Sequence, residues 1–123
     1  MTRLLALLMT FALCAPTFGQ SKAPKTGGPD CSGGWPTNMT FTHLKNAGLV
    51  DNSSVDFSKT KTLRVASEKI GKNLWHQVYH VVFTKNSGEV IETIAIHDAS
   101  REECSMTGVE VFVISKHLYP EGK

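Results

Sequence analysis

The segment LWHQVYHVVFTKNSGEVIETIAIH (residues 74–97) determines the fold of this chain. Its two halves, residues 74–84 and 89–97, are dense in β-branched and aromatic side chains, which favour β-strands. Between them, Lys85-Asn86-Ser87-Gly88 is typical of a tight connection. The segment therefore predicts an antiparallel hairpin.

The length of the turn decides which side chains of the hairpin share a face, because successive residues of a strand point to opposite sides. A turn of two or four residues is expected, and both lengths give the same two faces. The predicted core face carries Trp75, Tyr79, Val81, Phe83, Val90, Ile94 and Ile96, with Gln77 and Glu92 as polar exceptions. The opposite face carries His76, Val78, His80, Val82, Ile91, Thr93, Ala95 and His97.

Further elements are expected on both sides of the hairpin. Residues 60–69 and 109–117 have strand-like composition, and a short helix is expected to begin at Trp35 and to end before Gly48. Thr37 or Asn38 can cap the start of this helix. Residues 35–123 are therefore predicted to form a single α+β domain, in which one short N-terminal helix packs on a four-stranded antiparallel β-meander.

The N-terminus has the three-part pattern of a secretory signal peptide in residues 1–19. Arg3 gives a basic start, an apolar run from Leu4 to Cys14 follows, and small residues lead to a cleavage site after Gly19. The apolar run is too short for a permanent transmembrane helix, so no integral membrane segment is expected after cleavage. Residues 20–34, rich in Gly, Pro, Ser and Lys, are predicted to be a flexible leader.

The cysteine count predicts one disulfide bond. Cys14 leaves with the signal peptide, so the exported chain keeps Cys31 and Cys104. An even number of cysteines in an oxidising compartment favours a Cys31–Cys104 bridge.

The charge balance excludes nucleic acid and anionic membrane surfaces as main partners. The 13 Lys and Arg residues nearly match the 11 Asp and Glu residues, and the Lys residues are scattered along the chain. Nucleic acid and anionic lipid both require a concentrated basic patch.

The histidines of the second hairpin face are the candidate metal or catalytic residues. With a four-residue turn, His76 pairs directly with His97, which is close enough to share a metal ion. His80 lies too far along the strand from His76 to complete that site. Because two histidines without a third ligand make a weak site, and because no serine or paired-carboxylate motif is present, no catalytic residue, metal or cofactor is predicted.

The polar loop of residues 98–106 is the candidate partner-binding segment, with Asp98, Ser100, Arg101, Glu102 and Glu103 as contact residues. A disulfide at Cys104 would pin this loop and lower the entropy cost of binding a protein. His76, His80 and His97, together with Ile91 and Thr93, mark an adjoining candidate face.

Several blocks of the chain resemble a group of small exported proteins of Gram-negative bacteria. The blocks are WPTNMTF (35–41), LKNAGL (44–49), ASEKIGK (66–72), HDASREECSMTGV (97–109) and VISKHL (113–118). Some members of that group are encoded beside effectors of type VI secretion. The resemblance therefore implies a periplasmic immunity protein, which binds a cognate bacterial toxin and occludes its active site.

Two other classes of function remain open at this stage. One is a small secreted metal-binding protein or enzyme that uses His76, His80 and His97. The other is an envelope accessory domain that binds peptide or lipid, for example by adding a strand at a sheet edge. A last strand at such an edge could also form a homodimer.

Overall fold

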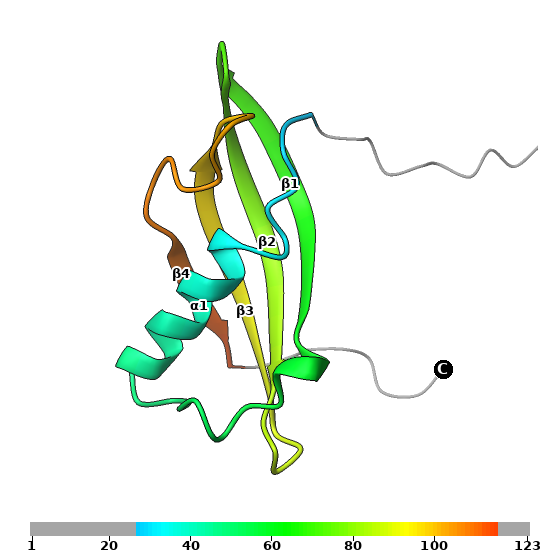
Figure 1. Ribbon diagram of the computed structural model, residues 1–123, viewed down its shortest axis with the longest axis vertical. Coiled ribbons are helices and arrows are strands. Elements are labelled where there is room, and N and C mark those ends of the chain that lie inside the picture. Colours follow the sequence, from blue (N-terminus) through cyan, green and yellow to red (C-terminus); the bar gives the residue numbers. More distant parts are fainter. Residues whose placement is uncertain (1–26, 116–123) are drawn as a thin grey trace, which may run out of the picture.

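The computed structural model describes residues 27–115, which form a helix, a 3-10 turn and a four-stranded antiparallel sheet (Figure 1). The strands follow one another in the sheet in the order β1-β2-β3-β4, and α1 lies across one face (Figure 1). The elements are α1 (Trp35–Asn46), η1 (Phe57–Lys59), β1 (Lys61–Gly71), β2 (Leu74–Thr84), β3 (Val90–Ala99) and β4 (Glu110–Ile114). This arrangement confirms the predicted α+β fold of one helix on a four-stranded meander. The predicted signal peptide, residues 1–19, lies outside the described residues.

The turn of the β2–β3 hairpin consists of Asn86, Ser87 and Gly88, so its length is odd. The Lys85 N–H donates to the Glu89 carbonyl at 2.7 Å, and the Gly88 N–H donates to the Lys85 carbonyl at 2.9 Å. Gly88 has a φ of 91°, a left-handed conformation that glycine adopts without strain. This is a type I turn closed by a glycine bulge, a common form of three-residue hairpin loop.

The odd turn length reverses the predicted faces of β3. Val81 pairs with Thr93, and His76 pairs with Asp98 instead of His97. The core face of β2 is as predicted, with Trp75, Gln77, Tyr79, Val81 and Phe83 buried. On β3, however, the buried residues are Ile91, Thr93, Ala95, His97 and Ala99. The predicted placement of Val90, Glu92, Ile94 and Ile96 in the core was therefore wrong, because an odd turn shifts the register by one residue.

Helix α1 packs its buried face, Pro36, Thr40 and Leu44, against β2 and β3. These residues are four positions apart and so lie on one side of the helix. The helix ends as predicted near Gly48, whose φ is 74°; the following N–H, from Leu49, donates back to the Leu44 carbonyl.

The start of α1 differs from the prediction. Gly34 is the N-cap and provides no side-chain cap, so Thr37 and Asn38 do not have the predicted capping role. The Thr37 hydroxyl instead donates to the carbonyl of Ser32 at 2.6 Å, which connects the helix to the segment before it.

Residues 27–34, expected to be part of a flexible leader, lie against the sheet through buried polar contacts. The Tyr79 hydroxyl accepts from the Cys31 N–H and donates to Gln77 Oε1, both at 2.9 Å. Gln77, which is fully buried, donates from Nε2 to the Pro29 carbonyl at 2.8 Å, and Arg64 donates to the same carbonyl at 2.6 Å. Gln77, the polar exception on the core face, thus provides a hydrogen-bond partner for a backbone carbonyl that lies outside the strands.

The predicted disulfide bond between Cys31 and Cys104 is confirmed. It connects the segment before α1 to the loop between β3 and β4. Within residues 27–115, no helix is long and apolar enough to cross a membrane.

The Tyr79 hydroxyl should contribute measurably to stability. We expect Tyr79→Phe to lower the free energy of unfolding by about 1–3 kcal/mol, because the buried Cys31 N–H and Gln77 Oε1 would lose their partner. Denaturant unfolding measures the change. Thr42→Val, which removes an exposed helix hydroxyl, is the control and should change stability by less than about 0.5 kcal/mol. Equal stability of Tyr79→Phe and the parent would contradict this account of residues 27–34.

Candidate functional site

The face of the sheet that points away from α1, termed the outer face, has an apolar centre. It consists of alternate residues of all four strands, as the pairing register defines them. Its apolar members are Leu63, Ala66, Val78, Val82, Val90, Ile94, Ile96, Phe112 and Ile114. Leu63 is 63% exposed and Phe112 is 51% exposed. In the described part of the chain, α1 and residues 27–34 pack on the opposite face and leave this one open.

Two histidine–carboxylate pairs cross from β2 to β3 on the outer face. His76 Nδ1 lies 2.6 Å from Asp98 Oδ1, and His80 Nε2 lies 3.6 Å from Glu92 Oε2. The first distance is a hydrogen bond that orients the imidazole, while the second is a longer contact that becomes an ion pair only with a protonated imidazole. The structure therefore brings three of the predicted site residues, His76, His80 and Asp98, to one surface.

His97 lies on the other side of the sheet. Its side chain is 2% exposed, and its ring centroid is 5.5 Å from that of Tyr79. His76 and His97 thus point to opposite faces, and the metal-sharing pair considered from the sequence does not form. Among residues 27–115, no cluster of three or more His, Cys, Asp or Glu side chains could hold a metal ion.

Burial lowers the pKa of His97 below its ordinary value of 6.5. Nearby backbone groups of Cys104 and Asp98 act in the opposite direction. Neither ring nitrogen, however, has a hydrogen-bond partner in the described residues. His97 is therefore a neutral core residue at pH 7, which removes it from the candidate partner contacts.

The loop between β3 and β4 is held in place by the turn that joins β1 to β2. Asn73, in that turn, accepts from the Arg101 N–H at 3.1 Å and donates to Glu102 Oε2 at 2.6 Å. Ser100 is buried; its N–H donates to the Glu103 carbonyl, and its hydroxyl accepts from the Glu103 N–H. With the disulfide at Cys104, these contacts order the loop.

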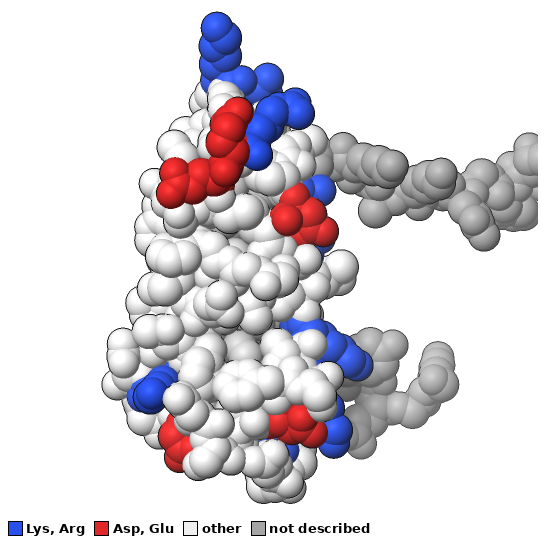
Figure 2. All heavy atoms as spheres, viewed as in Figure 1, with Lys and Arg blue, Asp and Glu red and all other residues white. Residues whose placement is uncertain are grey.

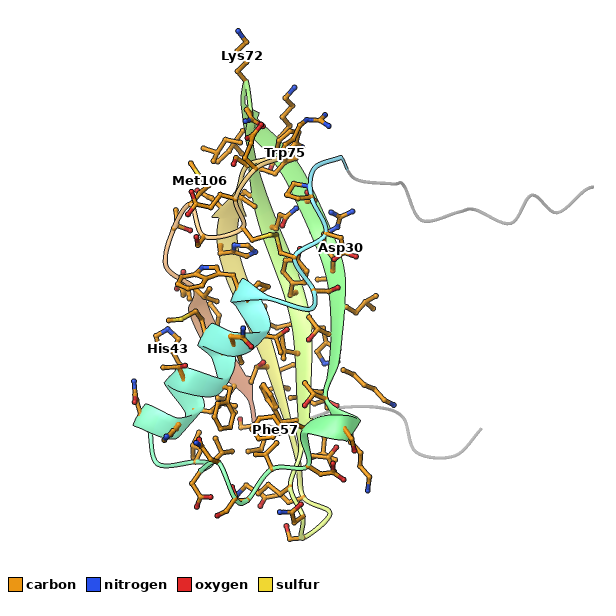
Figure 3. The ribbon with its side chains drawn as sticks, viewed as in Figure 1. Asp30, His43, Phe57, Lys72, Trp75 and Met106 are labelled. Carbon is orange, nitrogen blue, oxygen red and sulfur yellow. A yellow bond between two sulfur atoms is a disulfide. The ribbon has the colours of Figure 1, made fainter. Side chains whose placement is uncertain are left out.

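Trp75 provides an aromatic base for the same loop. It is 3% exposed, and the Arg101 guanidinium lies 5.1 Å from its ring centroid, within the range of a cation–π contact. On the N-terminal side, a Cβ at Gly28 would come within 2.6 Å of the Trp75 ring, and Gly28 has a φ of 95°. Only glycine therefore allows residues 27–34 to pack this closely. The stick view places Trp75 and Met106 near the Lys72 end of the molecule, opposite Phe57 (Figure 3).

The loop presents its charges to solvent. Arg101, Glu102 and Glu103 are exposed, and the hydrogen bond from Asn73 lowers the pKa of Glu102, which keeps that carboxylate ionised. Figure 2 shows acidic and basic side chains together at this end of the molecule, above a broad uncharged area on the face that carries α1. The loop is thus a preorganised, charged projection beside His76 and Asp98.

Three contributors to this site were missed by sequence reasoning. Asn73 is the residue that connects the two turns, and Leu63 and Phe112 extend the apolar outer face onto the edge strands. The sequence Asn-Ser-Gly could have predicted the outer face. A glycine in the left-handed conformation commonly closes a three-residue hairpin turn, and the turn length decides which residues of β3 point outward. No local signal identifies Asn73, because its partners lie 28 and 29 residues away.

The burial of His97 predicts a loss of stability at mildly acidic pH. Below pH 6.5 the unfolded chain binds a proton that the folded chain disfavours, so the free energy of unfolding should fall by up to about 1.4 kcal/mol per pH unit. The carboxylates with lowered pKa have ordinary values of 3.8 to 4.5, so they contribute little above about pH 5.5.

Urea unfolding at about pH 7 and about pH 5.5 measures this slope. His97→Phe should flatten it, whereas His43→Gln, on the exposed side of α1, should leave it as in the parent. If His97→Phe keeps the pH dependence of the parent, a group other than His97 causes the loss of stability.

Comparisons with protein-family models, with curated proteins and with solved structures find no match for this chain. They add no support to the resemblance to small exported proteins. The functional argument accordingly rests on the outer face and the charged loop.

Proposed function

We propose that this protein is a periplasmic binding protein without enzymatic activity, and that it acts as an immunity protein against a toxin of type VI secretion. The observation that carries the proposal is the outer face, an apolar sheet surface open to a partner. Large contiguous apolar surfaces on soluble domains are typical of protein-binding sites. The identity of the partner as a toxin rests on the sequence resemblance.

The composition of the outer face favours a protein as the partner. Its centre carries aliphatic side chains of β2 and β3, and Leu63 and Phe112 continue it onto the edge strands. Charged groups such as Lys61, Glu68 and Glu110 lie on the same face toward the ends of the edge strands. An apolar centre with a polar rim is the usual anatomy of a protein–protein interface. The two histidine–carboxylate pairs add hydrogen-bonding groups within the surface.

The ordered loop supports an inhibitory role. Its conformation is held by the disulfide, by Asn73 and by Trp75, so little entropy would be lost when it binds. Exposed charges of both signs can steer a partner and select it against others. A loop of this kind can enter an active-site cleft without any catalytic group of its own.

The compartment is supported by two features. A disulfide bond persists in oxidising compartments such as the periplasm. Residues 1–19 have the composition of a signal peptide.

The outer face can be tested by charge insertion. We expect Leu63→Glu combined with Phe112→Glu to abolish binding to the cognate toxin, because the charges would have to be desolvated at the interface. Both side chains are more than half exposed, so folding should be retained. Leu49→Glu changes an apolar residue outside this face that is 43% exposed; it is the control and should bind as the parent does. Calorimetric titration of the purified pair measures the affinity, and growth of cells that export the toxin measures protection.

The outcome separates the parts of the proposal. Protection by the parent and by Leu49→Glu, with loss in the double variant, supports both the role and the surface. Protection by the double variant as well as by the parent and Leu49→Glu would exclude the outer face as the interface. If no exported protein encoded beside the chain is toxic in the periplasm, the immunity role is contradicted.

The role of the charged loop between β3 and β4 is tested with a separate double variant. Glu102→Gln combined with Glu103→Gln removes two charges, while a Gln side chain can still accept the hydrogen bonds that Asn73 and Ser105 now donate. We expect slower association and weaker salt dependence, with thermal stability nearly unchanged. Glu89→Gln, at the opposite end of the sheet, serves as the charge control. Association rates that match the parent at low salt would contradict a steering role for the loop.

A further inference from the structure

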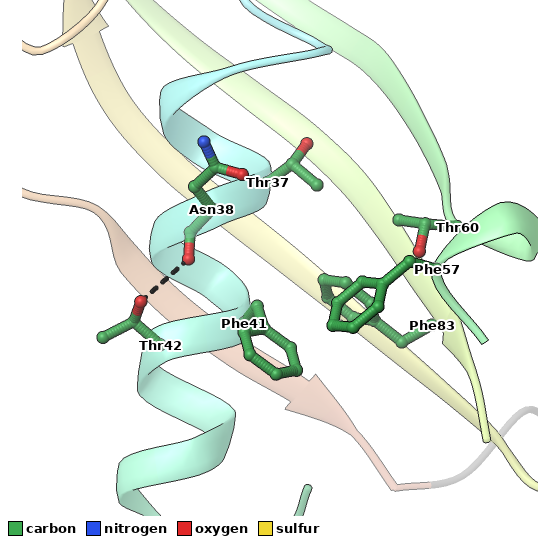
Figure 4. Close-up of a pocket in the computed structure, with 7 residues that line it drawn as sticks. All are labelled: Thr37, Asn38, Phe41, Thr42, Phe57, Thr60 and Phe83. Carbon is green, nitrogen blue, oxygen red and sulfur yellow. Dashed lines mark hydrogen bonds between the residues drawn. The ribbon is translucent and has the colours of Figure 1, made fainter. Parts of the chain in front are cut away.

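A pocket of about 380 Å³ opens between α1, η1 and β2, on the side of the sheet opposite the outer face (Figure 4). Helix α1 provides one wall, and Phe57 and Thr60, at the two ends of η1, provide the other. The lining residues are Thr37, Asn38, Phe41, Thr42, Phe57, Thr60 and Phe83. None of them contributes to the outer face or the charged loop.

Three phenylalanine rings form the apolar part of the pocket. The centroids of Phe41 and Phe57 are 5.0 Å apart in an edge-to-face arrangement, and those of Phe41 and Phe83 are 5.9 Å apart. Phe83 is buried, whereas Phe57 is 51% exposed. A planar apolar group placed here would cover the exposed side of Phe57 and extend the ring cluster.

One polar atom in the pocket wall has no partner. The Thr60 hydroxyl oxygen is buried and makes no hydrogen bond within residues 27–115. The Thr37 hydroxyl, by contrast, is bonded to the Ser32 carbonyl and to Thr62. A buried hydroxyl without a partner is destabilising, and a bound group with a hydrogen-bonding atom would relieve that cost.

We propose that this pocket binds a neutral aromatic ring with one hydroxyl group, that is, a phenol. The ring would lie among the three phenylalanines. Its hydroxyl would bond to the Thr60 hydroxyl after rotation about the Thr60 Cα–Cβ bond brings that buried oxygen to the pocket surface. The lining residues carry no charge, so a charged ligand would be desolvated without compensation. The phenol can be a free small molecule or the tyrosine side chain of a partner. The site is independent of the proposed immunity role.

The first test asks whether the pocket prefers a ring with a hydroxyl group to the same ring without one. The purified protein is titrated with p-cresol and with toluene, and amide chemical shifts are followed by NMR. A merely apolar pocket prefers toluene, because its transfer from water is more favourable. We expect saturable shifts around Phe41, Phe57 and Thr60, with p-cresol binding about tenfold more tightly than toluene. Equal or tighter binding of toluene would overturn the proposal.

Variants of two threonines provide the second test. Thr60→Val should remove the preference for p-cresol while the melting temperature stays equal or rises, because the unpartnered hydroxyl is lost. Thr40→Val is the matched control: its hydroxyl donates to the Pro36 carbonyl outside the pocket, so stability should fall and p-cresol binding should persist. A lower melting temperature and unchanged p-cresol affinity in Thr60→Val would contradict a ligand role for this hydroxyl.

A third titration distinguishes the two sources of the phenol. The probe is the peptide acetyl-Gly-Tyr-Gly-amide, with the Phe analogue as its control. Binding of the Tyr peptide at least as tight as that of p-cresol assigns the pocket to a protein side chain. Binding of p-cresol alone assigns it to a free phenol, and binding of neither ligand excludes the proposal.

Discussion

The hydrogen bond from the Lys85 N–H to the Glu89 carbonyl sets the register between β2 and β3, on which the rest of the structure depends. It encloses a turn of odd length, and that parity directs Thr93, Ala95 and His97 toward α1. The small Ala95 leaves space for the helix. The larger Ile94 and Ile96 are directed to the opposite side, where they form the centre of the outer face. One turn therefore determines both the core and the candidate binding surface.

A second constraint follows from the shape of the core. Residues 27–34 form no strand, so their backbone groups need other partners when they are covered. Gln77, Tyr79 and Arg64 supply those partners, and the Cys31–Cys104 bridge connects the same segment to the loop after β3. The order of residues 27–34 and the order of the charged loop are thus coupled through Trp75, which contacts both.

The candidate site was predictable only in part. The polar composition of residues 98–106 and the cysteine pair identified the loop, and the hairpin pattern identified His76 and His80 as residues outside the core. His97 was assigned to the wrong side because the prediction considered only even turn lengths. Asn73 and the exposed Leu63 and Phe112 were missed because their importance comes from contacts and openings that no local pattern records.

The sequence by itself determined the helix, the strands, the buried face of β2 and the disulfide pair. These follow from local composition, from residue spacing and from the even number of cysteines that remains once the predicted signal peptide is set aside. The tertiary structure decided which side of β3 is buried, how residues 27–34 are held and which turn supports the charged loop. Each of these depends on a turn's hydrogen bonds or on contacts between residues far apart in the chain, such as Cys31 and Tyr79, 48 positions apart. Such contacts form only when the sheet, the helix and the N-terminal segment come together.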